Sequence, residues 1–243
     1  MLKPQLKDVT LLMIETRCHE LAARAVLDSI AKVDFGDVVI FTDKPQELKV
    51  PGAYYVQVDD WPNKLGWAEC YWYEAYKRVR TSHALLIQWD SWVFCPDMWR
   101  SHYLAFDYIG APWWYKFWNV GNSGFGMRSL ELMRFVAKNC DLYPVTTAAE
   151  DDLMSRKYRP ALEAHGDFKW ADDSTALDFS FECIRRSRDS RHFGFHALKN
   201  WPFVLSKDEL NERLFLASKN PYIASTDMLK QLEFGKHPHY LED

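Results

Sequence analysis

The chain has no apolar stretch long enough to cross a membrane. The apolar run near its start covers only residues 9–14, whereas a membrane-spanning helix needs about 20 residues. The sequence also lacks a Cys-x-x-Cys pair, and its five cysteines lie far apart. An odd number of scattered cysteines favours a reducing compartment over a disulfide framework. The sequence therefore predicts a cytoplasmic protein, with at most peripheral association at the inner face of a membrane.

An excess of basic residues is missing too. The 243 residues carry a formal net charge of -4, so the chain has no general means of neutralising a nucleic-acid backbone, and nucleic acid is not expected as a partner. Hydrophobic residues make up 48% and charged residues 26%, a balance typical of globular chains. The length fits one α/β domain. We expect a single domain over residues 1–243, with a core at about 9–202 and a wrapping segment at 203–243.

Apolar patterning near the start of the chain predicts a β-α-β unit. Residues 9–14 and 38–41 are short apolar runs, and apolar residues recur at helical spacing between them. A right-handed crossover makes the two strands parallel, so their carboxyl ends meet at one sheet edge, where ligands bind. The polar residues that follow these strand ends are Glu15, Thr16, Arg17, Thr42 and Asp43. They are candidates for holding the base and ribose of a nucleotide, although helix caps and turns use the same residue types.

Further short runs extend this pattern. Strands are expected at residues 54–58, 84–87 and about 107–111, and helices at 65–79 and about 130–137. This alternation predicts an α/β fold with an open, mostly parallel, twisted sheet flanked by helices.

An aspartate follows the expected strand at 84–87, in the sequence Gln88-Trp89-Asp90. A carboxylate at the end of a buried strand is suited to a divalent cation such as Mg²⁺ or Mn²⁺. Such a cation would neutralise the charge on the departing diphosphate of a nucleotide-sugar. The sequence thus predicts Asp90 as a metal ligand and Gln88 as a neighbouring donor-binding residue, although strand-end aspartates also cap helices and turns.

Three glycines are concentrated at residues 121–126, in a run that begins Gly121-Asn122-Ser123-Gly124. We interpret it as a glycine-rich turn that passes closely beneath a bound sugar or phosphate. The run is neither a Walker A loop nor a dinucleotide-binding turn. A tight turn with a purely structural role is the alternative.

Three consecutive carboxylates occur at Glu150, Asp151 and Asp152. Like charges this close raise one another's proton affinity, which can keep one of them as a base near neutral pH. A helix amino terminus would favour the same acidic cluster through its dipole and free N–H groups.

Two further features are consistent with a sugar site that contains a metal. His196 follows an aromatic-glycine turn and could complete the shell of a cation, although a lone histidine also serves as an ordinary hydrogen-bonding residue. The chain has 11 tryptophans, and indoles stack on the apolar faces of sugars or fill a core. Trp113 and Trp114 are the expected stacking wall.

Taken together, these elements resemble metal-dependent glycosyltransferases of the GT-A fold, and most closely a bacterial group of GT-A-like proteins. The residues that carry the resemblance are Gln88-Trp89-Asp90, Asp107-Tyr108-Ile109-Gly110-Ala111-Pro112-Trp113, Gly121-Asn122-Ser123-Gly124, Glu150-Asp151 and Gly194-Phe195-His196. The resemblance covers roughly residues 9–202 and implies a GT-A-like, Rossmann-type sheet. The family's Asp-x-Asp motif keeps only its last carboxylate here.

The resemblance extends to inverting galactosyltransferases and implies roles for several residues. Asp151 would deprotonate the acceptor hydroxyl, Glu150 would help to orient it, and His196 would join Asp90 on Mn²⁺ or Mg²⁺. Thr16, Arg17, Thr42, Asp43, Gln88 and Asp90 would bind the donor, a nucleotide-diphosphate-sugar such as a UDP-sugar. Trp113, Trp114, Gly121, Asn122, Ser123, Gly124 and Asp152 would contact the sugar or a glycan acceptor, as in the synthesis of bacterial surface polysaccharide.

Two other functions stay open at this point. A glycoside hydrolase would use paired carboxylates as acid and base and would need no nucleotide. A non-catalytic sugar- or nucleotide-binding module would keep the fold without turnover, and the reduced Asp-x-Asp motif favours it.

Overall fold

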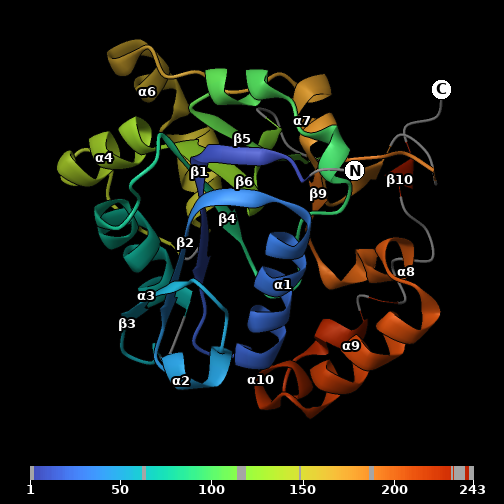
Figure 1. Cartoon of the computed structure of the whole chain (residues 1–243). Helices are drawn as coiled ribbons and strands as arrows, with labels where there is room; N and C mark the ends of the chain where they lie inside the picture. The colour runs from blue at the N-terminus through green and yellow to red at the C-terminus, as the bar shows by residue number, and fades with distance from the viewer. Residues whose placement is uncertain are drawn as a thin grey trace.

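The computed structural model describes residues 3–61, 64–113, 119–147, 149–185, 189–230, 232 and 239–240. At its centre is a six-stranded sheet with the strand order β3-β2-β1-β4-β6-β5, visible in Figure 1. The strands are β1 (Gln5–Ile14), β2 (Asp34–Thr42), β3 (Tyr54–Gln57), β4 (His83–Ile87), β5 (Tyr108–Pro112) and β6 (Val120–Ser129). Strands β1 to β4 pair in parallel, and β6 runs antiparallel to β4 and β5. The predicted α/β fold with an open, mostly parallel sheet flanked by helices is confirmed.

Side chains of β1 enter hydrophobic clusters on both faces of the sheet. Leu11 and Met13 pack in one cluster with helix α1 (His19–Lys32), whereas Leu12 and Ile14 pack in another. Burial on both faces explains why residues 11–14 of this strand are all apolar rather than alternating with polar residues.

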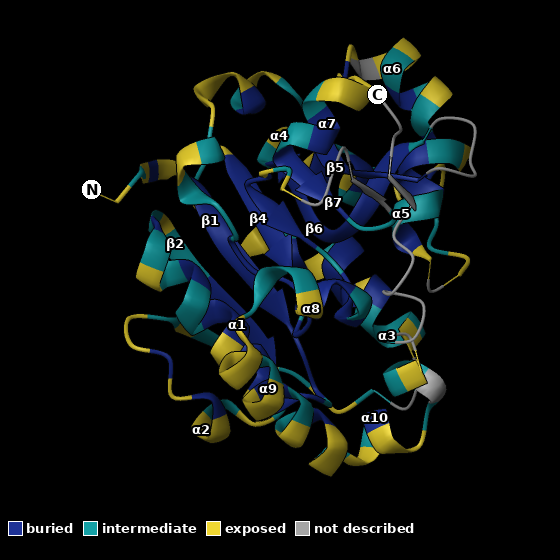
Figure 2. Cartoon of the chain, turned by 90° about the vertical axis from the view of Figure 1, so that its right-hand side faces the viewer, coloured by how far each residue is buried: buried dark blue, intermediate teal, exposed yellow. Residues whose placement is uncertain are grey.

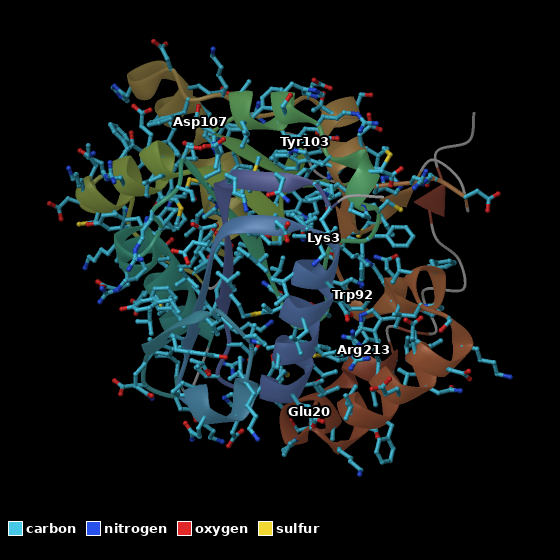
Figure 3. The ribbon with its side chains drawn as sticks, viewed as in Figure 1. Lys3, Glu20, Trp92, Tyr103, Asp107 and Arg213 are labelled. Atoms are coloured by element: carbon cyan, nitrogen blue, oxygen red, sulfur yellow. The ribbon has the colours of Figure 1, made fainter. Side chains whose placement is uncertain are left out.

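The carboxyl-terminal helices α8 (Trp201–Val204), α9 (Lys207–Lys219) and α10 (Pro221–Ala224) lie beside α1 in Figure 1. Arg213 on α9 places its guanidinium 4.5 Å from the ring centre of Trp92, and Figure 3 labels these two residues next to each other. Figure 2 shows exposed residues on α9 and α10 and the almost wholly buried strands of the central sheet.

The predicted helix at 65–79 is divided into three pieces. Helix α3 (Lys64–Glu69) is followed by a π-helical turn, η1 (Cys70–Glu74), and a 3₁₀ turn, η2 (Ala75–Lys77). The π turn adds a residue to the helical repeat, and the consecutive residues Cys70, Tyr71 and Trp72 are all buried. The apolar period of an ordinary α-helix does not anticipate such a turn.

The other elements are short helices and turns and two separate pairs of strands. They are α2 (Pro45–Leu48), η3 (Pro96–Met98), η4 (Ser101–Ala105), α4 (Leu130–Lys138), α5 (Glu150–Asp152), η5 (Leu153–Lys157), α6 (Arg159–Gly166), α7 (Asp173–Phe179), β7 (Ser180–Phe181), β8 (Ile184–Arg185), β9 (Gly194–Phe195), η6 (Leu198–Asn200), η7 (Asp227–Lys230) and β10 (His239–Tyr240). Strand β7 pairs with β9, and β8 pairs with β10. None of the helices in the described part of the chain is both long and apolar enough to cross a membrane.

The expected glycine-rich turn at 121–126 is wrong, because these residues belong to strand β6. Among the described residues, Gly52 is the only glycine with a positive φ, so the three glycines of β6 do not serve a left-handed turn. They serve close packing instead: a Cβ at Gly121 would overlap the ring of Trp113, and one at Gly124 would overlap the ring of His196.

Strand β6 also has an irregularity that directs side chains out of the sheet. Its pairing with β5 shifts between Gly110 and Ala111, whose partners are Gly126 and Asn122. Residues 123–125 are therefore a bulge in β6, a feature that re-aims side chains next to functional sites.

Candidate active site

A pocket of about 310 Å³ lies at the edge of the sheet where β1 and β4 end. Because β6 is antiparallel, its first half reaches the same edge. Helices α5, α3 and α10, each of which contributes to the pocket, follow one another down one side of the molecule in Figure 2. The lining residues are Glu15, Thr16, Arg17, Lys64, Trp67, Gln88, Trp89, Asp90, Ser123, Glu150, Asp151, Glu182, His196, Ala197, Tyr222 and Met228.

This edge brings together eight of the predicted site residues. They are Thr16, Arg17, Gln88, Asp90, Ser123, Glu150, Asp151 and His196. Segments far apart in the sequence thus meet at the expected edge of the sheet.

His196 and Asp90 form an ion pair in this pocket. Nε2 of His196 lies 3.5 Å from Oδ1 of Asp90 and 3.2 Å from Oε1 of Gln88. Burial alone would lower the pKa of His196, but the charges and hydrogen bonds of Asp90 and Glu182 raise it to about 10. Because Gly124 has no side chain, it leaves the space that the imidazole of His196 fills.

Glu182 contacts the other ring nitrogen of His196 and was not predicted. Its Oε1 lies 3.6 Å from Nδ1 of His196, and its Oε2 accepts a hydrogen bond of 3.0 Å from Nδ2 of Asn122. Burial alone would raise the pKa of Glu182, but His196 and Lys199 bring it below its usual value. Glu182 belongs to no acidic run, and only the pairing of β7 with β9 brings it to His196.

Asn122 therefore lies behind the pocket wall rather than in it. Besides holding Glu182, it accepts a 3.0 Å hydrogen bond from the backbone N–H of Gly124 through Oδ1. The predicted contact between Asn122 and a sugar stays untested, and its observed contacts are those of a support for Glu182 and Gly124.

Glu150 forms a fully buried ion pair with Arg128 of β6. The distance from Oε2 of Glu150 to Nη2 of Arg128 is 2.5 Å, and both side chains are 2% exposed. Oε1 of Glu150 accepts a hydrogen bond from the hydroxyl of Ser123. Both carboxylate oxygens thus have protein partners. Arg128 was not predicted, because an arginine that follows a glycine-rich run does not reveal which carboxylate it will meet.

Asp151 has the proton affinity expected of a base at neutral pH. Burial, together with the negative charge of Glu150, raises the pKa of its carboxyl to about 7. Its neighbour Asp152 instead pairs with Arg156 at 3.0 Å and is about one-third exposed. The three acids of α5 therefore have three different environments, and Asp151 and Glu150 line the pocket whereas Asp152 does not.

Glu15 holds the turn that leads into α1. Its Oε1 accepts backbone hydrogen bonds from Arg17 at 2.7 Å and Cys18 at 3.0 Å. Burial raises the pKa of Glu15 against the lowering effect of these bonds. The turn alternative thus holds for Glu15, although this side chain also lines the pocket.

The other two donor-binding candidates lie outside this pocket. Thr42 is fully buried, and its Oγ1 accepts a 3.3 Å hydrogen bond from the N–H of Lys44. Asp43 pairs with Nε2 of His19 at 2.6 Å. His19 and Lys44 line a second hollow of about 550 Å³, which shares Thr16, Arg17 and Tyr222 with the pocket. Asp43 therefore borders the second hollow through His19.

The aromatic wall of the pocket differs from the predicted one. Trp113 is buried beside Gly121, and Trp114 lies outside the described residues. Trp67 and Trp89 line the pocket instead. The indole N–H of Trp67 donates a 2.8 Å hydrogen bond to the carbonyl of Ile14, which anchors that ring at the end of β1.

The remaining candidates have structural partners. The carbonyl of Gly121 accepts a hydrogen bond from the hydroxyl of Tyr108, and Gly124 packs against His196. Asp107, the first residue of the longest shared motif, accepts hydrogen bonds from Oγ of Ser129 and from the N–H of Lys169. Figure 3 shows Asp107 at the opposite end of the molecule from Glu20, which lines the second hollow.

A metal site in this pocket would depend on few protein ligands. Within the described residues, no three His, Cys, Asp or Glu side chains are grouped closely enough to hold a metal ion. Oδ1 of Asp90 is buried there without a hydrogen-bond partner, and Nε2 of His196 lies 3.5 Å from it. Asp90 and His196 thus form a pair of donors, which fits a hard cation that takes its other ligands from phosphate oxygens and water.

Comparisons with known proteins assign the chain to a family. Residues 68–196, more than half of the chain, match the family described as Protein of unknown function (DUF5672), and the chain belongs to that family. No curated protein matches the sequence.

Two solved structures show distant similarity to this chain. One is a glycosyltransferase involved in the glycosylation of the major capsid of PBCV-1, with 14% identity and a TM-score of 0.48 over 86% of this chain and 98% of that one. The other is the bifunctional IspDF from Campylobacter jejuni, with 11% identity and a TM-score of 0.43 over 68% of this chain and 48% of that one. Neither similarity is close enough to assign a function.

Proposed function

We propose that this protein is a glycosyltransferase that moves a sugar from a nucleotide-diphosphate-sugar, in particular a UDP-sugar, to a hydroxyl group of a glycan acceptor. The observation that carries the proposal is the placement of Asp151, whose pKa is raised to about 7, in the same pocket as Asp90 and His196. A base and a site for a diphosphate on one sheet edge are what this transfer requires.

The donor has suitable partners across the pocket and the adjoining hollow. Arg17 and Lys64 place positive charge at the pocket, where a diphosphate would lie. The second hollow begins at Thr16 and Arg17 and would take the base and ribose, with the His19–Asp43 pair at its border.

Asp90 and His196 would hold Mg²⁺ or Mn²⁺. His196 would bind through Nε2 by giving up the proton that its raised pKa keeps on the free ring. Nδ1 would stay directed toward Glu182, because an acidic partner on the second nitrogen orients a ligating histidine. The bound cation would supply stabilisation of the negative charge that develops on the leaving diphosphate.

Asp151 would act as the general base. Its carboxylate takes the proton of the acceptor hydroxyl while that oxygen attacks the anomeric carbon, and the bond from this carbon to the diphosphate oxygen breaks. Attack from the face opposite the diphosphate inverts the configuration. Trp67 and Trp89 are the indoles placed to contact the sugar.

A glycoside hydrolase is the second candidate, because two carboxyl groups of unlike proton affinity line the same pocket. Asp151 has a raised pKa and Glu182 a lowered one, which is the division of roles between the acid and the carboxylate of such enzymes. Its substrate would contain no nucleotide.

Thermal shift and turnover with nucleotide-sugars test the two candidates directly. A transferase should be stabilised by UDP with Mn²⁺ and should release UDP from one donor of a nucleotide-sugar panel. Release of sugar from simple aryl glycosides, with no response to any nucleotide, would contradict the transferase and support the hydrolase.

A further inference from the structure

The ion pair between Arg128 and Glu150 is almost completely buried, and its presence needs a functional explanation. Removing two charges from water is unfavourable, and well-packed apolar residues often stabilise a core as well or better. Both side chains are nevertheless 2% exposed, with 2.5 Å between their charged atoms. Glu150 itself lines the pocket next to Asp151, and Arg128 lies behind it.

Arg128 is held by aromatic side chains from two other elements. Its guanidinium carbon lies 4.4 Å from the ring centre of Tyr71 in η1 and 4.8 Å from that of Tyr108 in β5. Nη2 also donates a 3.4 Å hydrogen bond to the hydroxyl of Tyr108. Two ring faces and a carboxylate leave the planar guanidinium little freedom, so Arg128 is a fixed positive charge at this point.

Glu150 connects Arg128 with the pocket. One oxygen of Glu150 contacts Arg128, and the other accepts the hydroxyl hydrogen of Ser123 in the bulge of β6. Helix α5 continues directly into η5, and Glu150 is its first residue, so these contacts anchor the amino-terminal end of the helical segment. Fixing Glu150 fixes the backbone that carries Asp151.

We infer that Arg128 is a positioning residue for Asp151: by holding Glu150 it places the Asp151 carboxyl against the pocket and balances the negative charge beside it. The catalytic meaning of this inference rests on the proposed function, whereas the effect on the Asp151 carboxyl itself does not.

The charges around Asp151 determine what each substitution should do. The groups that face it are Glu150 and Asp152 on its own helix, Arg128 on β6, Tyr71 and Tyr108 on η1 and β5, and Glu182 after β7. Across the pocket lie Glu15, Arg17, Lys64, Asp90 and His196. Glu150 raises the pKa of Asp151 and Arg128 lowers it. Loss of Glu150 should therefore lower the titration midpoint of Asp151, whereas loss of Arg128 should raise it.

The test is a carbon-13 carboxyl NMR titration of the full chain, free of ligand. The wild-type Asp151 carboxyl should titrate near pH 7. Glu150→Gln should shift the midpoint to lower pH, Arg128→Met should shift it to higher pH, and the double variant should return it toward the wild-type value. Arg134→Met, on the exposed surface of α4, is the matched control and should leave the midpoint unchanged.

Folding of the variants can be separated from this effect. Arg128→Met leaves Glu150 buried without its partner and is expected to unfold at a lower temperature, whereas the double variant removes both charges and should recover part of the loss. Should Arg128→Met fail to fold, Glu150→Gln and the double variant still give a pair of midpoints whose order is predicted.

Asp151 midpoints that stay at the wild-type pH in all the folded variants would overturn the inference, as would shifts of the same sign in both single variants. The proposed function fails separately, if no nucleotide-sugar is turned over although the predicted shifts occur. Where transfer is measured, the ascending limb of the pH profile should shift in the same direction as each NMR midpoint, which a merely structural pair would not produce.

Discussion

Asp90 and His196, which come from distant parts of the chain, lie 3.5 Å apart at the edge of the sheet. Asp90 lies three residues beyond the end of β4, whereas His196 directly follows the short strand β9. Their pairing provides the carboxylate and the imidazole that the proposed cation site requires.

The first prediction concerns this pair. At a ligand concentration 100 times the dissociation constant, UDP with Mn²⁺ should raise the free energy of unfolding of the wild type by about 2.7 kcal/mol. Each kcal/mol should raise the melting temperature by about 2–4 °C. Asp90→Asn and His196→Ala should lose the part of the shift that depends on Mn²⁺, as measured by thermal unfolding. Asp8→Asn, an exposed substitution on β1, is the control. A full Mn²⁺-dependent shift in Asp90→Asn would remove that residue from the site.

The second prediction concerns the pH dependence of transfer. Because a general base must be deprotonated, kcat/KM should rise with pH through about 7, where burial and Glu150 place the pKa of Asp151. A pH profile with saturating Mn²⁺ measures this limb. Activity that is already constant from pH 5 upward would exclude a base with such a pKa.

The third prediction concerns stability. The pKa of Asp151 is raised from 3.8 to about 7 in the folded chain, so the folded state binds more protons than the unfolded state between these values. The free energy of unfolding should therefore fall as the pH rises through this range. Asp151→Asn, which cannot ionise, should unfold at a higher temperature than the wild type at pH 8 and at a similar temperature near pH 4. Asp141→Asn, in an exposed turn, should show no such difference, and equal stability of Asp151→Asn and the wild type at pH 8 would count against the raised pKa.

The fourth prediction concerns Gly124. A Cβ at this position would overlap the imidazole of His196, so Gly124→Ala should displace the ring and destabilise the fold by about 1–3 kcal/mol. The response to UDP with Mn²⁺ should be lost as well. Gly52→Ala is the matched control, because its positive φ makes the substitution strained while no atom lies within 4 Å. Unchanged ligand response in folded Gly124→Ala would show that the ring does not need this space.

The first strands and α1 were predictable from sequence because each has a single dominant signal. Five of the six residues 9–14 are apolar, with Thr10 the exception, and burial of Leu11 and Leu12 on opposite faces explains this pattern. Ligands of open α/β sheets bind at the carboxyl ends of the parallel strands. This rule predicts a shared site for Thr16, Arg17 and Asp90, and all three line one pocket. Local patterning and sheet topology were sufficient for this part of the site.

The remaining parts depend on tertiary packing, which a local pattern does not contain. The glycines of β6 were interpreted through backbone freedom, whereas Gly121 and Gly124 exist for close packing. Glu182 and Arg128 acquire their partners only when separate strands meet. Tryptophans gave no indication of which rings would face the pocket, and Trp67 and Trp89 do so rather than Trp113.

The most direct measurement is a nucleotide-sugar panel assayed with Mn²⁺ for the wild type and for Asp151→Asn. Our account predicts that the wild type releases the nucleotide from one donor in the presence of a glycan acceptor. Asp151→Asn should bind the same nucleotide but transfer roughly 10²–10⁴ times more slowly. A wild-type protein that neither binds nor consumes any nucleotide-sugar, or an Asp151→Asn variant with the wild-type rate, would contradict it.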